Sequence, residues 1–118
     1  MLVVAAPADA QGFKWWRSEQ VQQDLQLTSD QVREIERIYE VSLPERRRLR
    51  DELDRLEQQL EQLLDRPQPD EHEAAALIDR VETARARRNA VRTMMLFHMR
   101  RVLTQQQRTA LAQRSLSR

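Results

Sequence analysis

Residues 49–71 read LRDELDRLEQQLEQLLDRPQPDE and combine a leucine repeat with an abrupt break. The leucines follow the 4-3-4-3 spacing that forms the seam of a coiled coil. They are Leu49, Leu53, Leu56, Leu60 and Leu63. Pro67 and Pro69 cannot continue a helix, so the first helix is expected to end near Asp65 and a second to begin at Asp70-Glu71. Because the break is short, the two helices are expected to pack antiparallel.

The start of the first helix is marked by the sequence LTSDQ at residues 27–31. Thr28 is a good N-cap, and Gln31, three residues later, can reach back to the backbone N–H of the cap. This arrangement is a capping box. Pro44 lies inside the long helix that follows and is expected to kink or break it. A short helix is expected before the box, from about Ser18 to Leu25.

The second long helix carries its own stripe and ends at a second box. The stripe has the same 4-3-4-3 spacing and contains two polar interruptions. Its members are Leu77, Val81, Ala84, Arg88, Val91, Met95, His98 and Val102. The sequence LTQQQ, made by Leu103, Thr104 and the residues up to Gln107, then predicts a short last helix.

Composition supports an all-α protein and excludes several classes of function. One third of the 118 residues are charged, one residue is Gly, and aromatic residues are 4%. β-sheet is therefore disfavoured. The 20 basic and 19 acidic residues do not give the basic excess of a nucleic-acid binder. The chain has no Cys, no glycine-rich phosphate loop and no catalytic constellation, and we predict that it is not an enzyme.

The first ten residues, MLVVAAPADA, resemble the end of an export signal. Ala8-Asp9-Ala10 is a small-x-small pattern of the signal-peptidase type, and cleavage there would leave Gln11 as the first mature residue. We therefore expect a leader at 1–10, a single helical domain at 11–114 and a frayed tail at 115–118. A disordered apolar tail is the alternative for the leader. Phe13, Trp15 and Trp16 follow, either as an anchor onto the helical body or as an exposed contact for a partner.

Two LTxxQ boxes at opposite ends of a helical hairpin, preceded by Trp15-Trp16 and a signal-like leader, resemble the Spy/CpxP family. This family includes heavy-metal-resistance proteins and metal sensors, and the resemblance covers roughly residues 13–113. It implies a cradle-like homodimer in the periplasm. It also implies an ATP-independent chaperone or stress adaptor that binds unfolded or envelope proteins or a membrane signalling partner. The alternative is a heavy-metal sensor or resistance protein. Metal-binding relatives carry several His residues, whereas this chain has only His72 and His98.

The hairpin predicts a basic surface. Folding about residue 68 brings residues 46–50 near residues 86–90, so arginines from both helices should meet there. The candidate residues for binding a client or partner protein are Arg46, Arg47, Arg50, Arg85, Arg88 and Arg92. The other interpretation is that these are solvated faces with ion pairs along each helix.

A metal hypothesis concerns Met94 and His98, which lie four residues apart and should share a helix face. A thioether and an imidazole suit a soft metal such as Cu(I), with Met95 and Met99 nearby and Glu34 or Glu36 approaching from the other helix. The alternative is ordinary packing of a Met-rich seam. No metal or other cofactor is assigned on this basis.

Overall fold

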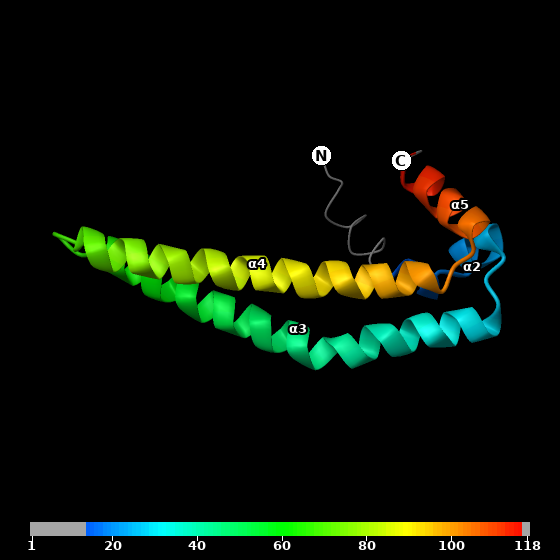
Figure 1. The fold of residues 1–118 in the computed structure, drawn as a ribbon, viewed down its shortest axis with the longest axis horizontal. Helices are drawn as coiled ribbons and strands as arrows, with labels where there is room; N and C mark the ends of the chain where they lie inside the picture. The colour runs from blue at the N-terminus through cyan, green and yellow to red at the C-terminus, as the bar shows by residue number, and fades with distance from the viewer. Residues whose placement is uncertain (1–13, 117–118) are drawn as a thin grey trace. The chain divides into compact units, whose positions relative to one another are not determined.

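The computed structural model describes residues 14–116, and every element in that range is helical (Figure 1). The elements are the 3-10 turn η1 (Trp15–Arg17) and the helices α2 (Glu19–Leu25), α3 (Ser29–Leu64), α4 (Glu71–Arg101) and α5 (Gln105–Leu116). The predicted all-α class, with two long helices and short flanking ones, is therefore confirmed. The expected leader at 1–10 and the end of the tail, 117–118, lie outside the described residues.

The helix ends follow the predicted signals closely. Ser18 caps α2, because its Oγ accepts a hydrogen bond from the N–H of Val21 at 3.3 Å. Asp70 caps α4 by accepting from the N–H of Glu73 at 2.8 Å. Helix α3 continues through Pro44, so of the two expected outcomes the break does not occur. Helix α5 includes residues 115 and 116, which were expected to belong to the frayed tail.

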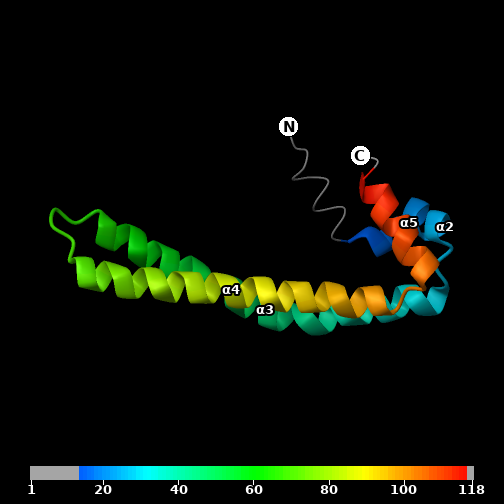
Figure 2. The ribbon, with the colours of Figure 1, turned by 45° about the horizontal axis from the view of Figure 1, so that its top comes forward.

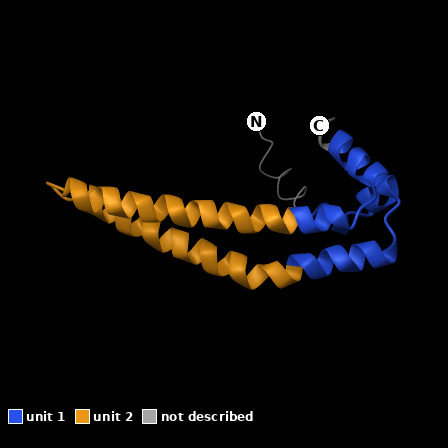
Figure 3. Ribbon diagram, in the orientation of Figure 1, with its two compact units in different colours: residues 1–39, 97–118 blue, residues 40–96 orange. Residues whose placement is uncertain are grey.

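The chain divides into two compact units (Figure 3). Residues 40–96 form the first, which we call the hairpin unit. The second, the end unit, contains the residues up to Tyr39 and those from Phe97 onward.

In the hairpin unit, α3 and α4 run side by side in opposite directions (Figure 1 and Figure 2). Leu53 and Leu56 of α3 form a buried cluster with Val81 and Ala84 of α4. The predicted leucine seam is therefore confirmed, and each fully buried leucine contributes roughly 1.5–3 kcal/mol of transfer free energy. Because the hairpin unit consists of two helices, its buried side chains lie along the line of contact between those helices.

The end unit is built around Trp16, which is fully buried. Its indole Nε1 donates to Glu36 Oε1 at 2.7 Å, and its ring lies 5.3 Å from that of Tyr39. Trp15 is also buried and meets Trp16 edge to face at 5.7 Å. The anchor interpretation of these two residues is thus correct, whereas Phe13 lies outside the described range.

One position of the predicted α4 stripe is wrong. His98 is exposed, and Met99 is fully buried in its place. An α-helix repeats every 3.6 residues, so a strict 3.5-residue stripe drifts around its surface. Burying the imidazole would also leave a polar ring without water, whereas the Met99 thioether has no such cost.

Candidate functional site

Both LTxxQ boxes form as capping boxes. In the first, the N–H of Thr28 donates to Gln31 Oε1 at 3.0 Å, and the N–H of Gln31 donates to Thr28 Oγ1 at 3.0 Å. In the second, the Thr104 N–H donates to Gln107 Oε1 at 2.9 Å, and the Gln107 N–H donates to Thr104 Oγ1 at 3.1 Å. The flanking leucines differ in burial, since Leu103 is buried and Leu27 is half-buried.

The two boxes are also joined to each other within the end unit. Gln31 Nε2 donates to Gln107 Oε1 at 2.8 Å, and Gln107 Nε2 donates to Gln31 Oε1 at 3.1 Å. Each amide further donates to a carbonyl beside the other box, that of Val102 at 3.1 Å or that of Leu25 at 3.1 Å. Sequence reasoning missed this link. Its only signal was the repetition of the same motif at both ends of the hairpin.

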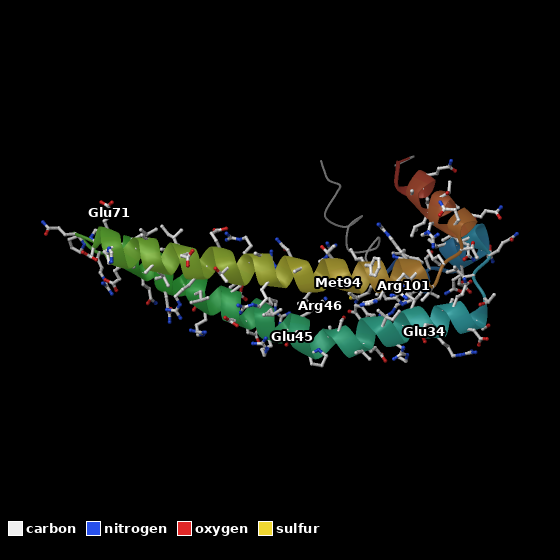
Figure 4. The ribbon with its side chains drawn as sticks, in the orientation of Figure 1. Glu34, Glu45, Arg46, Glu71, Met94 and Arg101 are labelled. Atoms are coloured by element: carbon white, nitrogen blue, oxygen red, sulfur yellow. The ribbon has the colours of Figure 1, made fainter. Side chains whose placement is uncertain are left out.

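The arginines predicted to bind a client do not all share one surface. Arg46 and Arg88 occupy positions along the seam and are half-buried. Arg46 Nε donates to Ser42 Oγ at 3.1 Å, and that hydroxyl lies 3.0 Å from Met95 Sδ. Figure 4 shows Arg46 between the two long helices, on the inner side of α3.

Of the other predicted arginines, three are exposed and Arg85 is half-buried. Arg47 and Arg92 are exposed, and Arg50 pairs with Asp51 at 3.3 Å. Arg85 bridges the helices by binding Glu57 at 2.7 Å and also pairs with Glu82. The hydrogen bonds that Arg85 donates to these two carboxylates, the one to Glu82 above all, raise the pKa of Arg85.

The hairpin unit has two chemically different sides. In an antiparallel pair, residues that directly follow a seam residue on either helix project to the same side. Arg85 and Glu57 both do so, and their 2.7 Å ion pair joins them. We call this side the mixed face, and its members include Arg50, Asp54, Glu57, Glu61, Leu64, Ile78, Glu82, Arg85 and Arg92.

Residues that directly precede a seam residue project to the opposite side. Glu52 does so and approaches both Arg48 at 3.5 Å and Arg87 at 3.9 Å, one on each helix. We call this side the arginine face, defined by Arg48 and Arg55 of α3 and by Arg80 and Arg87 of α4. The sequence argument foresaw a basic surface where the arginines of the two helices meet, and it did not foresee this division between sides.

The four residues of the metal hypothesis are split between exposed and buried positions. Met94 and His98 are exposed, while Met95 and Met99 are buried. The carboxylates expected nearby are already engaged. Glu36 binds Arg17 at 2.6 Å and Glu34 binds Arg37 at 2.6 Å. Hydrogen bonds from these arginines hold the pKa of both carboxyl groups below its usual range.

A metal site built from His, Cys, Asp and Glu side chains needs several of them close together. Zinc and similar ions require three or four protein ligands in close proximity. Between residues 14 and 116, no three His, Cys, Asp or Glu side chains are grouped so that they could hold an ion. His72 is exposed at the start of α4 and belongs to no such group among these residues. None of the described helices is both long and apolar enough to cross a membrane.

Comparison with known proteins identifies one family. A sequence model of a heavy-metal resistance family matches residues 1–110 of the chain. This match agrees with the resemblance to the Spy/CpxP family and its metal-resistance relatives. No curated protein and no solved structure matches the chain.

Proposed function

This chain belongs to the heavy-metal resistance family, and we propose that it is a periplasmic stress protein that acts by binding other proteins. Its targets would be unfolded envelope proteins or a membrane signalling partner. The family match supports the link to metal stress.

The observation that carries the proposal is the composition of the mixed face. Leu64 and Ile78 are 54% and 44% exposed there, each seven residues along its helix from Glu57 or Arg85. Arg85 and Glu57 are held in a cross-helix pair at 2.7 Å, so part of the charge on this face is already compensated. Exposed apolar side chains among arginines and paired charges are typical of surfaces that bind protein chains.

We also propose that the protein is a homodimer. The hairpin unit buries one seam between two helices, and a second copy would cover further apolar surface. Light scattering coupled to gel filtration measures this directly, and a monomer at micromolar concentration would contradict it.

The test of protein binding is suppression of aggregation. The full chain is mixed at stoichiometric ratio with a chemically unfolded model protein, and light scattering is followed after dilution. We expect suppression by the wild type and its loss in the Leu64→Gln/Ile78→Gln variant. Val41→Gln/Met94→Gln is the matched control, because these residues are 69% and 51% exposed but belong to the opposite side. Failure of the wild type to suppress aggregation would overturn the proposal.

A second candidate function is metal sensing through Met94 and His98. The specific observations are the family match and the exposure of both side chains, four residues apart on α4. Isothermal titration of the full chain with Cu(I), Zn(II), Ni(II) and Co(II) tests it. Tight binding that is lost in His98→Ala would support sensing, whereas no binding of any of these ions would remove this candidate.

A further inference from the structure

We propose that the arginine face of the hairpin unit docks on the phosphate headgroups of an anionic phospholipid surface. This inference goes beyond the proposed function, because it concerns the opposite side of the hairpin from the mixed face. It rests on the spacing of four arginines, on the distribution of carboxylates around them, and on two exposed apolar side chains that continue the same rows.

The four arginines form two parallel rows. Arg48 and Arg55 are seven residues apart on α3, and Arg80 and Arg87 are seven apart on α4. Seven residues are about two helical turns, or roughly 10.5 Å, so the rows have the same period. The rows lie on one side of two neighbouring helices and therefore suit an extended array of anions.

Carboxylates balance only one half of this array. Arg48 pairs with Glu45 at 2.7 Å and Arg87 approaches Glu52 at 3.9 Å. Nearer the hairpin loop, neither Arg55 nor Arg80 has a hydrogen-bond or ion-pair partner among residues 14–116.

The carboxylate that continues the α4 row at this end, Glu73, is already paired with Arg66 at 3.3 Å. The positions that precede the seam beyond Arg55 are Gln59 and Gln62, and the position between Arg80 and Arg87 is Thr83. This end of the arginine face is therefore positively charged, whereas carboxylates lie among the arginines of the mixed face.

The chemistry of the array favours phosphate. A guanidinium presents a planar fork of donors that matches phosphate oxygens, and it is less strongly hydrated than an ammonium group. Phosphates repeated over a flat area are what an anionic bilayer presents, and each basic residue near such a surface strengthens binding about fivefold.

Apolar side chains extend the rows on the same side. Val41 lies seven residues before Arg48, and Met94 lies seven residues after Arg87. They are 69% and 51% exposed. Side chains of this kind beside arginines can enter the boundary between headgroups and acyl chains. An acidic polypeptide would satisfy the arginines, but it would leave these two apolar side chains without a matching surface.

The experiment is co-sedimentation of the full chain with vesicles. Phosphatidylcholine vesicles containing phosphatidylglycerol are compared with vesicles of phosphatidylcholine alone, at low salt and at about 1 M salt, where the Debye length is about 3 Å. We expect binding to the anionic vesicles at low salt and its loss at high salt or without phosphatidylglycerol. Arg55→Gln/Arg80→Gln should weaken binding about 30-fold.

The matched control is Arg50→Gln/Arg92→Gln, which removes the same charge from the mixed face and should retain binding within a few-fold. Circular dichroism verifies that both variants are folded. The proposal is overturned by an absence of binding to the anionic vesicles at low salt, or by equal losses in the two variants. Binding of soluble polyglutamate without binding of vesicles would overturn it in favour of an acidic protein partner. The aggregation assay contains no lipid, so failure here leaves the proposed function intact.

Discussion

The side-chain amides of Gln31 and Gln107 form a reciprocal pair, with N–O distances of 2.8 and 3.1 Å, although 76 residues separate them in the chain. Each glutamine closes its own capping box and also binds the side chain of the other glutamine. Two local helix caps thereby become one tertiary contact within the end unit. Hydrogen bonds in such a network polarise each other, and loss of one partner leaves the other amide unsatisfied.

A double-mutant cycle on Gln31→Ala and Gln107→Ala should reveal this coupling. Each single substitution is expected to lower the free energy of unfolding by about 1–3 kcal/mol, because it removes a cap and leaves half-buried partners unpaired. The second substitution should then cost less than the first, with a coupling of about 1 kcal/mol or more. Urea denaturation followed by circular dichroism measures all four proteins.

Thr28→Ala and Thr104→Ala provide the control for this cycle. Each hydroxyl accepts from the N–H of the glutamine in its own box, so each substitution should cost about 1 kcal/mol and the two effects should add. Additive effects of the two glutamine substitutions would show that the amide pair contributes no coupling.

Features set by nearby residues could be predicted from the sequence. The capping boxes, the end of α3 before Pro67 and the leucine seam each depend on residues within one or two turns of each other. The burial of Trp15 and Trp16 against the helical body was also predictable, since large aromatic side chains are costly to leave in water.

Features that depend on the pairing of distant segments were not predictable in the same way. The register of α3 against α4 determines that Glu57 meets Arg85 on one side while Glu52 approaches Arg87 on the other. A shift of one residue along either helix rotates its side chains by about 100°, so sequence spacing alone could not decide which residue of α4 each residue of α3 meets. The Gln31–Gln107 pair could not be predicted for the same reason, because it also depends on how two distant segments pack.

The neighbours His98 and Met99 test where the seam of α4 runs. Met99→Ala should lower the free energy of unfolding by about 2–4 kcal/mol, because Met99 is fully buried and its removal leaves a cavity. His98→Ala should change it by about 0.5 kcal/mol or less, since His98 is exposed. Urea denaturation of the two variants shows whether His98 or Met99 lies in the seam. A larger loss in His98→Ala would restore the seam expected from the heptad spacing.

Glu36 should make the end unit sensitive to acid. Its carboxylate accepts from Arg17 at 2.6 and 3.1 Å and from Trp16 at 2.7 Å, and the Arg17 hydrogen bonds are the main cause of its lowered pKa. A carboxyl group whose pKa is lower in the folded state contributes stability above its unfolded pKa of about 4.3. This contribution is lost as the pH falls through the lower, folded value.

Glu36→Gln measures the contribution of this group. The variant should be less stable than the wild type by about 1–2 kcal/mol at pH 7, after allowance for the 29% exposure of the side chain. The difference should shrink as the pH is lowered from about 5 toward 3. Glu34→Gln is the control and should show a smaller effect, because its pair with Arg37 lies within one exposed turn of α3. A difference that does not depend on pH would contradict the assignment.

Pro44 lies in the interior of α3 and should be a source of instability that can be removed. Its ring nitrogen has no hydrogen to donate to the carbonyl of Glu40, yet the helix continues on both sides. Pro44→Ala should therefore raise the free energy of unfolding by about 1–3 kcal/mol, as measured by urea denaturation. Gln58→Ala, another exposed position inside α3, should change stability by about 0.5 kcal/mol or less. A loss of stability in Pro44→Ala would instead mean that the surrounding packing requires the local helix geometry that Pro44 imposes.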